Sequence, residues 1–244
     1  MALEKIQEEF EKIVLINKED DLFLDKFEDG NGFRNMRKFL REVIINFAEE
    51  SFSHYKNWGE FPFIYGEKQI HSTLTPSIHK HTGNIWLEQP FKDYKKNQRF
   101  LDIATIDKNN IYLIELKHSW NSKTDKITQR AFAEWEIAIK QIKDINRKTI
   151  YPHFNKDCNI FKIALMIMPT YLSSNQVHNI LSLNSKEYCE NIFNEFNNFF
   201  SQEHTKPNFN GTMKIKNPDK YIHKYINGEQ IYPYISFIGK VLLV

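Results

Sequence analysis

The fold is decided by two neighbouring stretches, RFLDIA at residues 99–104 and IYLIELKH at residues 111–118. Both are short, mostly apolar and rich in β-branched or aromatic residues, which is typical of buried β-strands. Between them lies Asp107-Lys108-Asn109-Asn110, a sequence that favours a tight hairpin turn. We therefore expect strands at 99–106 and 111–118 that are direct antiparallel neighbours in a sheet.

The second of these strands carries two charged residues, Glu115 and Lys117, near its C-terminal end. Side chains alternate between the two faces of a strand, so both point to the face that also holds Ile111 and Leu113. Burying an unpaired charge is costly, and a bound metal ion or a mutual ion pair usually offsets that cost. The pattern therefore leaves two readings open, a functional site and a structural ion pair.

The first strand offers a third charge, because Asp102 lies within its apolar run. Counting inward from the turn, Asp102 and Glu115 lie at similar depth. Two carboxylates close together are hard oxygen ligands of the kind that bind Mg²⁺ or Mn²⁺. A metal ion there could polarise a phosphoryl oxygen and activate a water, with Lys117 placing the water or neutralising developing charge.

Hydrophobic periodicity and turn residues predict the elements around this hairpin. We expect Thr124 or Asp125 to cap the helix after Lys117, Pro76 to interrupt or end the helix before the first strand, and Pro169 to bound the last buried strand. Residues 203–230 are predicted to be loop. The helices expected are 2–16, 33–55, 67–81, 124–146 and 175–200, and the further strands are 84–89, 161–168 and 234–244. Buried apolar stripes are expected on the helix at 33–55 (Met36, Phe39, Leu40, Val43, Ile44 and Phe47) and on the helix at 124–146 (Ile127, Ala131, Trp135, Ala138, Ile142 and Ile145).

The spacing of Asp102, Glu115 and Lys117 resembles the PD-(D/E)XK nuclease superfamily, in which an Asp on one strand precedes a Glu-X-Lys on the next. The resemblance covers residues 67–168. It implies a restriction-endonuclease-like α/β fold with an αβββαβ core, in which helices flank a mixed central sheet. A rival Asp-X-Lys, Asp93-Tyr94-Lys95, has no apolar strand around it.

The same resemblance implies further site residues. Many members place a metal-binding Glu on the first core helix, and Glu67 is the matching position. Several carry a Gln on the helix after the Lys, and Gln141 is the expected counterpart. Glu134 and Arg130 also lie beside the apolar stripe of that helix and could face the site instead. The family's conventional Pro before the Asp is Leu101 in this chain, a departure that removes no ligand. The implied catalytic set is Asp102, Glu115, Lys117, Glu67 and Gln141, and the implied metal ligands are Asp102, Glu115 and Glu67.

Charge is distributed unevenly along the chain. The formal net charge is only +2, which by itself counts against a nucleic-acid partner. Residues 1–60, however, hold nine Lys and Arg against fourteen Asp and Glu, so the remainder carries a basic excess. A metal-dependent nuclease needs carboxylates framed by basic groups that bind phosphates. The candidates for that rim are Lys123, Lys126, Arg130 and Lys140.

The organisation expected is a single domain over 1–244, with an N-terminal helical extension at 1–60, a nuclease-like core at 61–170 and a C-terminal elaboration at 171–244. The two cysteines make a disulfide framework and a four-cysteine zinc site unexpected. No secretory signal and no apolar run long enough to cross a membrane are recognised. We therefore expect a soluble, cytoplasmic protein with no membrane partner.

Three functional readings follow from the sequence. The first is a Mg²⁺- or Mn²⁺-dependent endo- or exodeoxyribonuclease; restriction, phage defence, repair or mobile-element processing are the settings that the resemblance implies. Its partner would be DNA, and a homodimer is one arrangement compatible with it. The second is a nuclease-like DNA-binding or assembly module that has lost cleavage. The third is an unrelated α/β protein in which Glu115 and Lys117 form a structural ion pair.

Overall fold

One mixed β-sheet runs through the whole molecule. In the computed structural model its strands follow the order β1-β6-β8-β5-β4-β3-β2, and β7 pairs with β8 away from this path. The strands are β1 (Val14–Asn17), β2 (Ile85–Lys92), β3 (Gln98–Asp107), β4 (Asn110–His118), β5 (Asn159–Ser173), β6 (Phe209–Lys214), β7 (His223–Tyr225) and β8 (Gly228–Leu243). The structure describes residues 9–11, 14–17, 31–93, 95–122, 127–145, 150, 158–173, 179–226 and 228–244.

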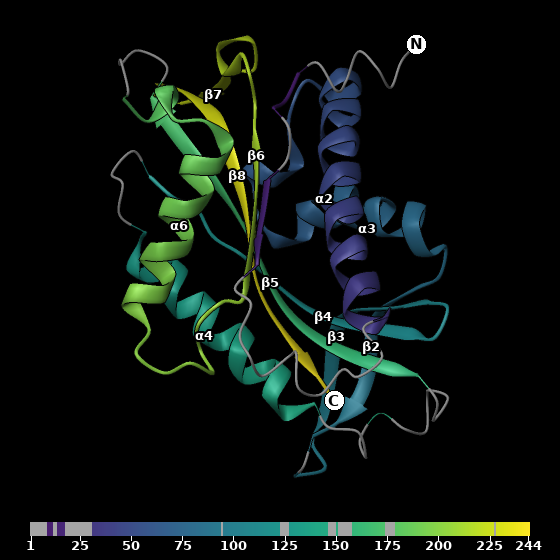
Figure 1. Cartoon of the computed structure of the whole chain (residues 1–244). Helices are drawn as coiled ribbons and strands as arrows, with labels where there is room; N and C mark the ends of the chain where they lie inside the picture. Colours follow the sequence, from purple (N-terminus) through teal and green to yellow (C-terminus); the bar gives the residue numbers. More distant parts are fainter. Residues whose placement is uncertain are drawn as a thin grey trace.

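Helices cover both faces of this sheet, which confirms an α/β fold with a mixed sheet flanked by helices. Figure 1 shows α2 and α3 on one side of the sheet and α4 and α6 on the other. The long helices are α2 (Asn31–Trp58), α3 (Glu67–Thr82), α4 (Gln129–Asp144) and α6 (Ser185–Phe199), and the short 3-10 turns are η1 (Pro62–Ile64), η3 (Asn179–Ser182) and η4 (Pro218–Lys220).

The central hairpin forms as its sequence predicts. Strands β3 and β4 are antiparallel, with Asp107 paired to Asn110 next to the turn and Ile103 paired to Ile114 further in. Strand β5 then lies parallel to β4, so the chain crosses over through α4 between them. The element order along this part of the chain is therefore α3-β2-β3-β4-α4-β5.

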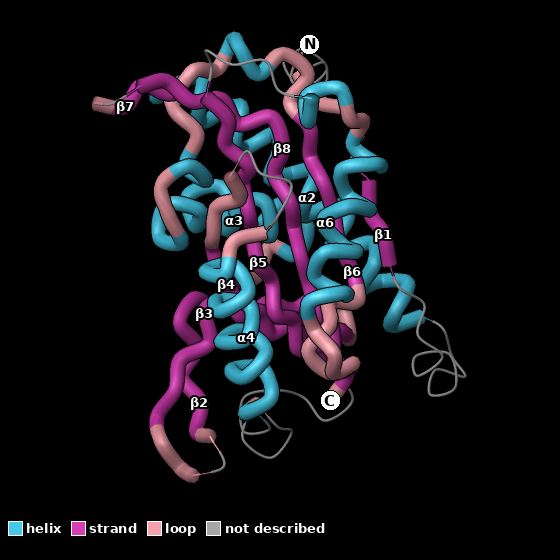
Figure 2. The backbone as a smooth tube through the Cα atoms, turned by 90° about the vertical axis from the view of Figure 1, so that its left-hand side faces the viewer, coloured by secondary structure: helices cyan, strands magenta, loops and turns pink. Residues whose placement is uncertain are grey.

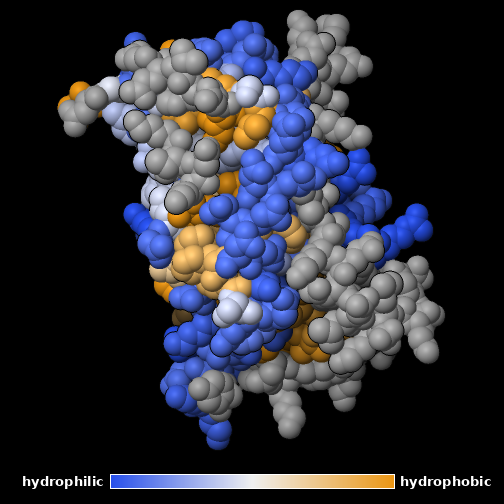
Figure 3. Space-filling view, turned by 60° about the vertical axis from the view of Figure 1, so that its left-hand side comes forward, coloured by the Kyte–Doolittle hydropathy of each residue, from blue (hydrophilic) through white to orange (hydrophobic). Residues whose placement is uncertain are grey.

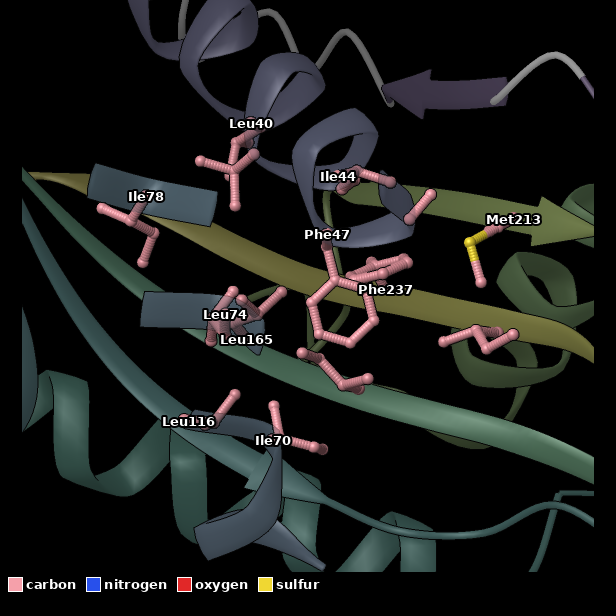
Figure 4. Packing of buried hydrophobic residues seen from close by; sticks show 14 of the residues in the cluster. Leu40, Ile44, Phe47, Ile70, Leu74, Ile78, Leu116, Leu165, Met213 and Phe237 are labelled. Carbon is pink, nitrogen blue, oxygen red and sulfur yellow. The ribbon is translucent and has the colours of Figure 1, made fainter. Parts of the chain in front are cut away.

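The larger hydrophobic cluster lies between the sheet and the helices α2 and α3. The stripe predicted for the helix at 33–55 is buried in full, from Met36 to Phe47. Figure 4 shows Phe47 of α2 close to Phe237 of β8, and the two rings are in edge contact at 5.2 Å. Helix α3 adds Ile70, Leu74 and Ile78, which repeat every four residues and so share one face.

A second cluster lies under α4 and α6 on the opposite face. Trp135 of α4 is fully buried, and Phe196 of α6 contacts it edge-on at 5.9 Å. The apolar stripe predicted for α4 is confirmed, since its members are all buried: Ile127, Ala131, Trp135, Ala138, Ile142 and Ile145. Side chains of β4 alternate between the two faces of the sheet: Tyr112 and Ile114 belong to the cluster under α2 and α3, while Ile111 and Leu113 belong to a third, smaller cluster on the α4 side.

Two of the predicted elements are wrong in type. The helix expected at 2–16 is contradicted at its end, because 14–17 form β1, which pairs antiparallel with β6. Residues 203–230 were expected to be loop, but they contain the strands β6 and β7. Both strands hydrogen-bond to β8. The N- and C-terminal parts of the chain therefore complete the same sheet as the central hairpin.

Four predicted boundaries also move. Helix α4 begins at Gln129, where the Thr128 hydroxyl accepts a hydrogen bond from the Ala131 N–H at 3.2 Å, so Thr128 is the cap. Helix α3 continues through Pro76 without ending. Strand β5 continues through Pro169, which pairs with Ile235. Of the helix expected at 175–200, residues 174–178 lie outside the described residues and α6 begins only at Ser185.

The surface over α4 and α6 is mostly hydrophilic and is interrupted by separate hydrophobic patches (Figure 3). Ile137 of α4 and Phe199 of α6 are among the exposed large apolar residues. Within the part of the chain that the structure describes, no helix is both long enough and apolar enough to cross a membrane.

Candidate functional site

The charged end of β4 is buried. All nine residues of this strand are buried, and the exposed fraction is 3% for Glu115 and 9% for Lys117. The Lys117 ammonium donates to Glu115 Oε1 at 3.0 Å and to the Leu116 carbonyl at 2.8 Å. Because neither charge reaches much solvent, each depends on the other and on nearby groups for its stabilisation.

Asp102 lies beside this pair on the neighbouring strand. Its Oδ2 accepts a hydrogen bond from the Leu116 N–H at 2.7 Å. This contact lies just past Ile103 and Ile114, the last paired residues of β3 and β4. The negative charge of Asp102 also acts on Glu115 and raises the pKa of that carboxyl.

Burial is the main cause of the altered protonation of Glu115. Burial, together with the nearby Asp102 charge, raises the pKa of the Glu115 carboxyl to about 8, although Lys117 opposes the shift. Burial alone would lower the pKa of Lys117, but the attraction of Glu115, Glu67 and Asp102 raises it instead. Near neutral pH the cluster therefore holds a charged lysine and a carboxyl that remains largely protonated.

Glu67 reaches the cluster from another layer of the fold. It begins α3, and its Oε2 lies 3.9 Å from Lys117 Nζ, with 40% of the side chain exposed. Burial raises the pKa of Glu67, and the charges of Asp102 and Glu134 raise it further against the pull of Lys117. One ammonium group thus faces the carboxyls of Glu67, Asp102 and Glu115.

The donor set suits a divalent cation even though the side chains are not arranged around one. Among the residues that the structure describes, no three His, Cys, Asp or Glu side chains are grouped as metal ligands; the Lys117 ammonium contacts both Glu115 and Glu67 instead. The available oxygens are carboxylates and the Leu116 carbonyl, which are hard ligands. Glu67, Asp102 and Glu115 together outnumber the one positive group, Lys117. A bound Mg²⁺ or Mn²⁺ would neutralise the negative charge that remains once these carboxyls are ionised.

Gln141 and Lys140 lie beside Glu115 in a hollow of about 300 Å³ between α4 and the β3–β4 hairpin. The Gln141 Oε1 atom is buried there and has no hydrogen-bond partner among the described residues. The exposed Lys140 brings a positive charge to the same hollow. Of the three residues considered for the glutamine position, Gln141, Glu134 and Arg130, it is Gln141 that shares this hollow with Glu115.

Unlike Lys140, none of the other basic residues expected at the rim is among the described residues that line this hollow. Lys123 and Lys126 lie outside the described residues. Arg130 is exposed at the start of α4 with its guanidinium 5.2 Å from the centre of the Trp120 ring. Arg99, which sequence reasoning did not select, also lines the hollow beside Glu115. No spacing in the sequence pointed to Arg99, because residues three apart on a strand point to opposite faces.

Asp93, which begins the alternative Asp-X-Lys motif, has a structural role. Asp93 Oδ1 accepts hydrogen bonds from the backbone N–H groups of Lys95 and Asn97, both at 2.9 Å, and Oδ2 accepts from the Asn97 side chain at 3.0 Å. Arg99 lies 3.4 Å from the same carboxylate. Asp93 therefore organises the turn between β2 and β3, and these bonds lower its pKa against the effect of burial.

His118 fixes the chain after Lys117. Its Nε2 donates to the Phe63 carbonyl at 2.9 Å, and its ring contacts Trp120 edge-on at 4.4 Å. Trp120 Nε1 in turn donates to the Ile64 carbonyl at 3.1 Å. Burial lowers the pKa of His118 to about 4, so the ring is neutral near pH 7.

No protein-family model matches this chain, and comparisons with curated proteins and with solved structures likewise give no match. The function of the protein must therefore be inferred from the geometry of the cluster and its place in the fold.

Proposed function

We propose that this protein is a metal-dependent nuclease of the PD-(D/E)XK type, which hydrolyses phosphodiester bonds in DNA. The observation that carries the proposal is the cluster of Asp102, Glu115 and Lys117 on the paired strands β3 and β4, in which Glu115 and Lys117 are buried and Asp102 is partly buried. The fold around the cluster also supports the proposal, because the element order α3-β2-β3-β4-α4-β5 is the αβββαβ order of that superfamily.

The residues of the cluster divide the chemistry between them. Asp102 and Glu115, with Glu67 beside them, would hold the cation through carboxylate oxygens. When bound, the cation would polarise a phosphoryl oxygen and lower the pKa of a coordinated water. Lys117 would position the attacking water by hydrogen bonding and neutralise charge that develops on the phosphate. Gln141 and Lys140 would contact the phosphate or the water from α4.

Proton release links metal binding to this cluster. A carboxyl whose pKa is raised to about 8 by burial is largely protonated at pH 7. It must lose that proton to become a metal ligand. We therefore expect metal binding to strengthen as the pH rises from 6 to about 8.

One cleavage assay tests the proposal. The protein is incubated with supercoiled plasmid, linear duplex and single-stranded DNA in the presence of Mg²⁺ or Mn²⁺. We expect cleavage that depends on the metal and that falls on the order of 100- to 1,000-fold in Asp102→Asn and in Lys117→Met, because each loses one group that stabilises the transition state. Asp219→Asn and Lys216→Met make the same chemical changes at exposed positions and should cleave normally.

The other readings give different results in the same assay. Binding of DNA without cleavage under any metal condition would indicate the binding or assembly module. The 3.0 Å contact between Lys117 and Glu115 also suits a purely structural ion pair. That reading requires no binding and no cleavage in the parent protein, together with a loss of stability in Lys117→Met.

A further inference from the structure

A second concave site lies where the chain leaves the candidate catalytic cluster. It has a volume of about 410 Å³ and is lined by Tyr65, Trp120, Tyr171, Tyr225, Gln230 and Tyr232, a set that we call the aromatic pocket. Its size falls within the range of small-ligand sites. In Figure 2, β7, which carries Tyr225, lies at the opposite end of the molecule from the hairpin of β2 and β3.

The rings of this pocket are held by specific contacts yet remain accessible. The Tyr232 hydroxyl donates to Gln230 Oε1 at 3.0 Å and accepts from the Tyr225 hydroxyl at 2.5 Å. Tyr65 and Tyr225 are each 43% exposed. When a flat ligand covers exposed tyrosine rings around one hollow, their apolar surface is removed from water, and this burial favours binding.

Two separate segments of the chain connect the aromatic pocket to the candidate catalytic cluster over only a few residues. Tyr65 lies two residues before Glu67, and Trp120 lies three residues after Lys117. A chain extends at most ~3.6 Å per residue, so the Cα atoms of these pairs are within about 7 and 11 Å. A DNA strand with a phosphate at Lys117 therefore has a neighbouring nucleotide within reach of the aromatic pocket.

We propose that the aromatic pocket binds an unpaired nucleobase of the DNA strand whose phosphate lies at the candidate catalytic cluster. This inference rests on the proposed function and deepens it, because it makes single-stranded or locally unpaired DNA the preferred substrate. Aromatic faces stack on any base, and the Gln230 amide and the tyrosine hydroxyls offer hydrogen bonds to its edge. The Arg130 guanidinium, 5.2 Å from the Trp120 ring, places a positive charge beside the same wall.

Binding is measured without metal, so that cleavage plays no part. A fluorescently labelled single-stranded oligothymidylate of about 12 nucleotides, a length within known site sizes, is titrated with protein in EDTA and its anisotropy recorded. We expect Tyr225→Ala and Tyr171→Ala each to weaken binding by about 5- to 150-fold, since one base–aromatic stack is lost. Tyr225→Phe keeps the ring and should bind within about twofold of the parent protein.

Trp86→Ala is the matched control for the loss of an exposed aromatic residue. Trp86 is 48% exposed on β2, away from the aromatic pocket, and its removal should leave binding unchanged. A fully paired duplex of the same length should bind equally to the parent protein and to Tyr225→Ala.

The outcomes separate this inference from the proposed function. Unchanged oligothymidylate binding in both Tyr225→Ala and Tyr171→Ala would overturn the inference, whether or not the protein cleaves DNA. An equal loss of duplex and single-stranded binding in these variants would also overturn it, because the pocket would then not discriminate unpaired bases. Selective loss without any cleavage by the parent protein would support the pocket and reject the nuclease.

Discussion

At the scale of single residues, the cluster is defined by an imbalance of charge. Glu67, Asp102 and Glu115 face the single ammonium of Lys117. The sequence located Glu115 and Lys117 because charged residues stand out at the end of an apolar strand. It could not predict which carboxyl keeps a proton, since that depends on burial and on the distance between side chains from different elements.

Glu115 should make the stability of the metal-free protein depend on pH. Its folded pKa, about 8, lies above the ordinary 4.5, so the folded state holds one more proton between these values. The contribution of this group is fully present below pH 4.5 and is lost as the pH rises through 8, at up to about 1.4 kcal/mol per pH unit. We expect Glu115→Gln to remove this dependence, as measured by urea unfolding in EDTA between pH 5 and 9.

A carboxyl outside the cluster supplies the comparison. Glu136→Gln changes an exposed residue of α4 and should follow the pH profile of the parent protein. Parallel profiles for Glu115→Gln and the parent protein would show that Glu115 titrates normally, and would remove the basis for the proton release expected on metal binding.

At the scale of elements, prediction succeeded where side-chain character alternates or repeats clearly. The stripe of α2 and the β3–β4 hairpin are examples. It failed for β6, which reads FNGTMK, because its inward positions include the polar residues Asn210 and Thr212. Asn210 is buried with its amide donating to the Cys189 carbonyl at 2.9 Å. Only the packed structure reveals that such a polar side chain has an internal partner.

The proline in β5 was misread for a related reason. The Pro169 carbonyl accepts from the Asn121 N–H at 3.0 Å, on the side where β4 has already ended at His118. In a strand the N and C=O of one residue point the same way, so the missing N–H costs no hydrogen bond to β8. A proline at this position therefore need not end the strand, and its neighbours cannot be known before the sheet order is known.

The pairing of β6 with β8 can be tested at Gly239. This residue lies opposite Phe209, and a Cβ at Gly239 would come 1.6 Å from the Phe209 ring. The ring is 2% exposed and enclosed by the sheet and its helix layer, so it has little room to move. We expect Gly239→Ala to lower the free energy of unfolding by about 3 kcal/mol, the upper part of the range for overpacking, measured by chemical denaturation.

Two further variants make that result specific. Gly66→Ala adds a Cβ that meets only the Gln69 side chain at 3.5 Å, in an extended backbone, and should change stability little. Combining Gly239→Ala with Phe209→Leu removes the clashing ring atoms and should recover part of the loss. If Gly239→Ala is as stable as Gly66→Ala, the packing of Phe209 on β8 is not as described.

At the scale of the whole molecule, the central hairpin cannot be separated from the rest of the chain. Strand β5 has β4 on one side and β8 on the other, and it pairs with β8 from Phe161 to Ser173. The C-terminal β6 extends the sheet further and pairs with the N-terminal β1. The central segment from α3 to β5 thus shares its sheet and its hydrophobic clusters with both ends of the chain.

We therefore expect a fragment of residues 1–173 not to fold by itself. Without β8, one edge of the mostly buried β5 would be open, and long apolar edges of this kind promote aggregation. Loss of β8 also removes Phe237 and Ile238, which belong to the clusters on opposite faces of the sheet. Co-production of residues 174–244 should restore a soluble complex with the circular dichroism of the full chain, detected by size-exclusion chromatography. A fragment 1–173 that is monomeric and unfolds cooperatively would show instead that the strands after β5 are an addition to a core that is stable without them.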